Sequence, residues 1–166
     1  MSNNVFLETV CVPELGEGTA LMIWGFRMCA LGRSECGCLE RCFDQKFEPD
    51  VSDYVVEELK HVVRQFGNHG KRGIYLGQPN CIHITHDEAS ILSALAAAQV
   101  GDQSLRDAHV TWLQVMPPSL ELQESLDRLA QAFLSSDYVI EHPLEHVTDH
   151  KQKFERTLLM GVGGHA

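Results

Sequence analysis

Apolar residues recur along most of the chain at spacings of three and four, which is the pattern of amphipathic α-helices, and clean alternation with a period of two is scarce. The sequence therefore predicts an all-α fold, a single-domain bundle of about six or seven helices. The first helix is expected over about 17–31 and is apolar on every side apart from Arg27. A helix of that kind usually lies at the centre of a bundle or against a partner chain.

Helix caps and helix breakers divide the rest of the chain. The clearest start is Thr85, because Thr85-His-Asp-Glu88 matches the S/T-x-x-E capping box directly before an apolar run. Glycines and a proline interrupt residues 67–81, which predicts a Gly-rich central loop. The further helices are expected over about 34–47, from Asp50 or Ser52 to Gly67, over 86–100, between 102 and 117, from Ser119 through Phe133, and from Pro143 through Leu158. Residues 1–160 are expected to form one domain and 161–166 a flexible tail.

Composition narrows the classes of function. The 166 residues carry a formal net charge of −10, which repels phosphate backbones and anionic membranes, so we expect no nucleic-acid partner. No apolar window reaches the roughly 20 residues that a membrane span needs, and the first residues lack the basic start and apolar run of a signal peptide. We therefore expect a cytoplasmic protein without membrane contact, whose six cysteines stay as thiols.

The sharpest local cluster of metal-ligand types is Cys81-Ile-His83-Ile-Thr-His86. Thiolate and imidazole are the preferred zinc ligands, and short spacings bring them to one ion at little cost in loop closure. Cys81, His83 and His86 are therefore the candidate ligands of a structural zinc. The spacing matches no standard zinc finger, and the alternative that these are a small buried thiol and two packed or exposed imidazoles stays open.

Two other clusters have structural alternatives that fit at least as well. Cys36, Cys38 and Cys42 could form a second thiolate site, but on one helix Cys36 would point away from Cys38, which favours buried thiols. Three acid–histidine doublets between residues 141 and 150 could bind metal or respond to pH, but they also suit a solvated helix face.

The one locally basic element is the glycine-rich stretch 67–73, in which Lys71 and Arg72 could hold a phosphate or carboxylate. It lacks the order of a P-loop, which favours an ordinary surface turn. Cys81 with a neighbouring histidine and Asp87 could form a nucleophilic site, but only closeness in sequence supports that.

No catalytic motif is present, so we expect a non-catalytic cytoplasmic interaction or accessory protein with a structural zinc site at the central loop, and with a protein partner or a second copy as its ligand. The alternative is a small enzyme or sensor that binds an anionic small molecule at the 67–73 loop, through Lys71 and Arg72, beside Cys81 and His83.

Overall fold

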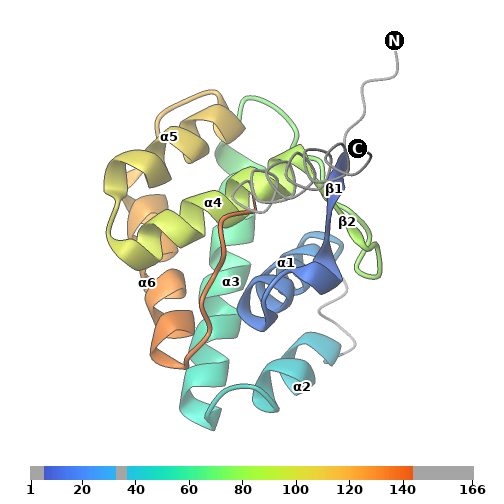
Figure 1. The fold of residues 1–166 in the computed structure, drawn as a ribbon. Coiled ribbons are helices and arrows are strands. Elements are labelled where there is room, and N and C mark those ends of the chain that lie inside the picture. The colour runs from blue at the N-terminus through green and yellow to red at the C-terminus, as the bar shows by residue number, and fades with distance from the viewer. Residues whose placement is uncertain (1–5, 33–36, 144–166) are drawn as a thin grey trace, which may run out of the picture.

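The computed structural model describes residues 6–32 and 37–143, and it confirms a mostly α-helical bundle (Figure 1). Within these residues a two-stranded sheet accompanies the helices. The strands are β1 (Phe6–Cys11) and β2 (His83–Thr85), and the helices are α1 (Glu17–Ala30), α2 (Cys38–Asp44), α3 (Pro49–His69), α4 (His86–Val100), α5 (Gln103–Gln114) and α6 (Leu120–Ser135), with a short 3-10 turn over Val12–Glu14.

Helices α3 and α4 make most of the contacts between helices. Helix α4 packs against α5 and α6, while α3 packs against α1, α2 and α6. The expected central role of α1 is confirmed, because most of its side chains are buried. Helix α4 is buried to a similar extent, since alanine, leucine and isoleucine leave it no strongly polar face beyond its first turn.

The capping signals form as expected. Thr85 caps α4 in a complete capping box with Glu88, and Gly101, in the left-handed region at φ 77°, turns the chain into α5. Asp102 then accepts a hydrogen bond from the Leu105 amide, and Ser119 does the same for α6. Helices α4 and α5, joined by this short turn, pack against each other as an αα-hairpin.

Three boundaries differ from the sequence prediction. Helix α2 begins at Cys38, after Gly37 in the left-handed region at φ 64°, rather than near residue 34. Helix α3 begins at Pro49 rather than at Asp50 or Ser52, because proline is well suited to the first turn of a helix. It also continues past Gly67 to His69, because an interior glycine weakens a helix without ending it. The helix predicted from Pro143 and the tail 161–166 lie outside the described residues.

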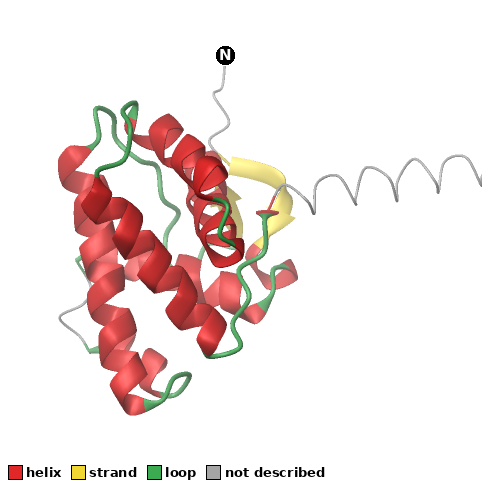
Figure 2. Cartoon of the chain, turned by 90° about the vertical axis from the view of Figure 1, so that its left-hand side faces the viewer, coloured by secondary structure: helices red, strands yellow, loops and turns green. Residues whose placement is uncertain are grey.

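The small sheet was not predicted. β1 pairs antiparallel with β2, with Phe6 opposite Thr85 and Cys11 opposite His83 across an irregularity in the register. Figure 2 shows both strands together at one side of the helices. A three-residue strand is too short for a period of two to register in the sequence, and its partner lies more than 70 residues away. None of the described helices combines the length and the apolar character that a bilayer span requires.

Candidate functional site: a groove beside the start of α4

A buried ion pair lies behind the start of α4. Arg27 of α1 is 1% exposed and Glu88 of α4 is 0% exposed. Arg27 donates from Nε to Glu88 Oε1 at 2.7 Å and from Nη2 to Glu88 Oε2 at 2.9 Å. This two-point contact matches the planar guanidinium to the carboxylate, and it ties the last turn of α1 to the first turn of α4.

The same two side chains hold the central loop. Arg27 also donates to the backbone carbonyls of Gln78 at 3.0 Å, Cys81 at 2.7 Å and His83 at 2.8 Å. Glu88 accepts from the backbone amides of Gly77 at 2.7 Å and Thr85 at 2.8 Å. Two buried charged side chains thus satisfy backbone polar groups of both the central loop and the adjoining strand β2.

A second ion pair joins the preceding residue of α4, Asp87, which is 5% exposed, to Arg72 of the central loop. Asp87 accepts two hydrogen bonds from the Arg72 guanidinium, at 2.9 and 3.0 Å, and one from the Tyr75 amide at 2.8 Å. The hydrogen bonds to Asp87 raise the pKa of Arg72 above its usual range. The Arg72 guanidinium also lies over the Trp112 ring, 4.7 Å from its centroid, in a cation–π contact.

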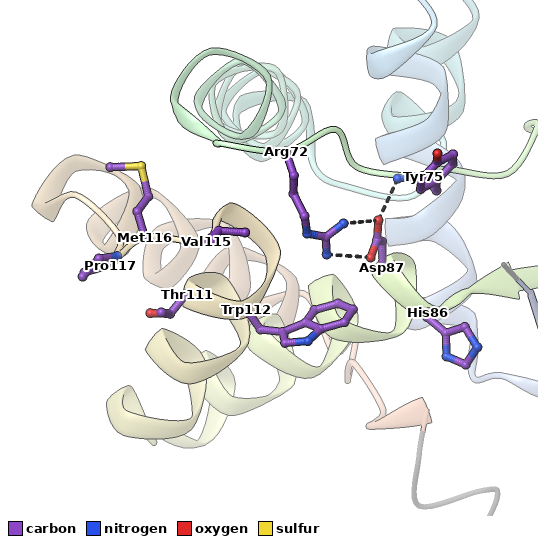
Figure 3. A pocket seen from close by; sticks show the side chains of 9 residues that line it. All are labelled: Arg72, Tyr75, His86, Asp87, Thr111, Trp112, Val115, Met116 and Pro117. Carbon is purple, nitrogen blue, oxygen red and sulfur yellow. Dashed lines mark hydrogen bonds and ion pairs between the residues drawn. The ribbon is translucent and has the colours of Figure 1, made fainter. Parts of the chain in front are cut away.

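These contacts line an open groove of about 710 Å³ between the central loop and α5. Figure 3 shows the Arg72–Asp87 pair between the Trp112 ring on one side and Tyr75 on the other. Tyr75 is 64% exposed, Val115 55% and Trp112 53%. The lining residues are Arg72, Tyr75, His86, Asp87, Thr111, Trp112, Val115, Met116 and Pro117.

The backbone at one end of the groove is strained. Val115 follows α5 with φ 57° and ψ 30°, in the left-handed region. A β-branched residue is rare there because its Cβ crowds the backbone. The strain holds an exposed apolar side chain against the groove, and strained positions cluster at functional sites.

The three predicted zinc ligands have different surroundings in the structure. The Cys81 carbonyl binds Arg27, the His83 ring faces Cys11, and His86 opens α4 at the rim of the groove. Across the described ranges 6–32 and 37–143, no group of three or more His, Cys, Asp or Glu is placed to hold a metal ion. Nothing in the geometry identifies these three residues as ligands of one ion.

The predicted anion-binding pair has different surroundings from those expected. Arg72 directs its guanidinium to Asp87 and to the Gly73 carbonyl, whereas the Lys71 residue is exposed and its backbone amide binds the Gln114 carbonyl. Of the predicted thiol cluster, Cys38 and Cys42 pack against the core, and Cys36 lies outside the described residues. Of the acid–histidine doublets only Glu141-His142 is described.

Sequence reasoning missed Arg27, Trp112 and Cys11 as site residues. A signal for Arg27 was present, because a lone cation in an otherwise apolar helix needs a buried partner. The capping box had already marked Glu88, but as a cap rather than as that partner. No comparable signal marks Trp112 or Cys11.

Comparison with known proteins adds no relative. No family model matches the chain. Neither the curated proteins nor the solved structures contain a match.

Proposed function

We propose that this chain is a non-catalytic cytoplasmic interaction protein that binds an apolar segment of a partner protein in the groove beside the start of α4. The observation that carries the proposal is the exposed indole of Trp112, held in place by the Arg72–Asp87 ion pair. Tryptophan, tyrosine and arginine dominate the residues that contribute most to protein interfaces, and the groove presents all three. Met116 adds a flexible apolar contact of the kind common in peptide-binding surfaces.

The groove is organised before any partner arrives. The Tyr75 backbone is fixed twice, by its amide on Asp87 and by its carbonyl, which accepts from the Thr85 hydroxyl at 2.6 Å. A site whose backbone is already ordered loses less entropy on binding. Its apolar walls then offer contact area while its charges are already paired with each other.

The pairing of those charges also separates this proposal from anion binding. An anionic small molecule would need the Arg72 donors that Asp87 already occupies at 2.9 and 3.0 Å. It would also approach the Asp87 carboxylate, which repels it. An apolar peptide segment needs neither donor, so the geometry favours a peptide ligand.

A peptide library tests the proposal without knowledge of the natural partner. Random 12-residue peptides displayed on phage are selected against the immobilised full chain, and enriched sequences are synthesised with a fluorescent label. We expect enrichment of aromatic and aliphatic residues, and binding that Trp112→Ala weakens at least tenfold, or about 1.4 kcal/mol, by fluorescence anisotropy.

Tyr54→Ala is the matched control. Tyr54 is also a large exposed aromatic residue, at 43%, but it lines a different surface hollow together with Lys46 and Ala132. The control should change affinity less than twofold. Peptides that bind wild type and Trp112→Ala equally, or a selection that enriches no apolar sequence, would contradict the proposal.

A further inference from the structure

The small sheet places a thiol opposite an imidazole. Cys11 is the last residue of β1 and His83 the first of β2, and the antiparallel register makes them partners. Cys11 Sγ lies 3.9 Å from His83 Nδ1, and both residues are partly exposed. We propose that Cys11 and His83 form a thiol modification site, in which the Cys11 thiol exchanges with a small disulfide and His83 acts as the base.

The backbone holds the two side chains in this arrangement. The Val12 amide, directly after Cys11, donates to the Ile82 carbonyl at 2.6 Å. The His83 carbonyl accepts from the buried Arg27 at 2.8 Å. Both partners are thus anchored within one residue of the contact, and a base placed in advance lowers the barrier to proton removal.

The chemical step balances without a cofactor. In the tautomer with its proton on Nε2, His83 Nδ1 takes the proton of the Cys11 thiol, and the thiolate attacks one sulfur of the small disulfide. A new S–S bond forms to Cys11 as the S–S bond of the reagent breaks, and the leaving thiolate takes the proton from the imidazolium. The products are a mixed disulfide on Cys11 and one small thiol.

Other cysteines in the chain provide internal references. Burial raises the pKa of the Cys29 thiol from 9.0 to about 11, so almost none of it is thiolate near neutral pH. Burial also raises the pKa of Cys42. Neither thiol has a histidine contact among the described interactions, and both should react slowly with the same reagent.

The test uses oxidised glutathione as the small disulfide and the full chain at pH 7.5. Mass spectrometry of proteolytic peptides gives the rate of glutathione addition at each cysteine. We expect Cys11 to react at least ten times faster than Cys29 and Cys42. Because this comparison is made within wild type, it does not depend on the folding of any variant.

A pair of variants then isolates the imidazole. His83→Gln should slow Cys11 at least tenfold and leave Cys81, two residues from the substitution, within twofold of its wild-type rate. His86→Gln removes the neighbouring imidazole at the rim of the groove and should leave the rate at Cys11 unchanged, because the Cys11 thiol faces His83. Circular dichroism confirms that each variant keeps its helices.

Four results would overturn the proposal. Cys11 could react no faster than Cys29, or equally fast in wild type and His83→Gln. Oxidation could instead join Cys11 to a second cysteine, giving a loss of two hydrogens with no glutathione attached. Metal analysis could also find an ion on untagged protein that blocks Cys11 until a chelator removes it.

Discussion

Replacing Glu88 by glutamine would remove one charge from the buried pair while keeping the size of the side chain. The Glu88 carboxylate accepts two hydrogen bonds from Arg27 and one each from the amides of Gly77 and Thr85. All four of these hydrogen-bonding groups, two on the Arg27 guanidinium and two backbone amides, are donors. A glutamine in the same place keeps one acceptor oxygen and turns an amide group toward donors that it cannot satisfy.

The cost follows from the burial of both partners. Their side chains are 1% and 0% exposed, so Arg27 would remain charged with no solvent to compensate it. Breaking a buried pair in this way costs about 3–5 kcal/mol, a large part of the roughly 5–15 kcal/mol by which such domains are stable. In a chain of this length each kcal/mol lowers the melting temperature by about 2–4 °C, so we expect a fall of about 10 °C.

Urea unfolding followed by circular dichroism measures this loss. Glu57→Gln is the matched control, because it removes the same charge from an ion pair with Lys60 in which Glu57 is 71% exposed, and its urea midpoint should stay at the wild-type value. A loss below about 1 kcal/mol in Glu88→Gln would refute the assignment of Arg27 and Glu88 as a tightly coupled pair. So would a double variant Arg27→Met, Glu88→Gln whose cost equals the sum of the two single costs, because partners in contact are not additive.

Two other changes probe the packing and the pH dependence of the fold. Gly77→Ala would place a Cβ 2.8 Å from Nη2 of buried Arg27 and should lower the free energy of unfolding by about 1–3 kcal/mol. Gly73→Ala is the control, because its Cβ would meet no atom within 4 Å, and it should not change the urea midpoint. Equal urea midpoints for the two variants would contradict this prediction. Burial, with a smaller effect of His142, lowers the pKa of His109 below 6.5, so the unfolded chain takes up a proton at a higher pH than the folded chain. The free energy of unfolding should therefore fall as the pH drops from 7.5 to 5.5, and it should fall less in His109→Asn. Equal losses of stability in the wild type and the variant would contradict the assignment of this pH dependence to His109.

Local signals were sufficient for most helices. Thr85 with Glu88, Asp102 and Ser119 each cap the helix that the sequence predicted, because a cap depends on residues within one turn of one another. The α4–α5 hairpin follows from the same kind of local chemistry at Gly101. The start of α2 was less predictable, since Gly37 can either continue a helix or take the left-handed conformation that it adopts here.

Contacts between distant segments set the site, and the sequence could not supply them. Arg27 meets Glu88 across 61 positions, and Cys11 meets His83 across 72. The predicted zinc ligands also depend on contacts that the sequence does not specify, and the described residues show no group of three placed to hold an ion. Cys81 lies in the loop, the strand covers only His83–Thr85, and His86 opens α4, as the capping box had indicated. Neighbours in sequence therefore follow different backbone geometries.

The consecutive carboxylates Asp87 and Glu88 hold different parts of the central loop. Asp87 is buried but lines the groove and fixes Arg72 and the Tyr75 amide, while Glu88 is buried in the interior and fixes Arg27 and the Gly77 amide. Successive positions on a helix are about 100° apart, so one first turn presents a carboxylate to the groove and another to the interior. Glu88 also accepts from the Thr85 amide, and the Thr85 hydroxyl holds the Tyr75 carbonyl in the groove, while Arg27 holds the carbonyl of His83. The groove and the thiol pair are therefore both connected to the Arg27–Glu88 pair. Loss of Glu88 should therefore weaken peptide binding and slow Cys11 together, even though Glu88 touches neither Trp112 nor the thiol.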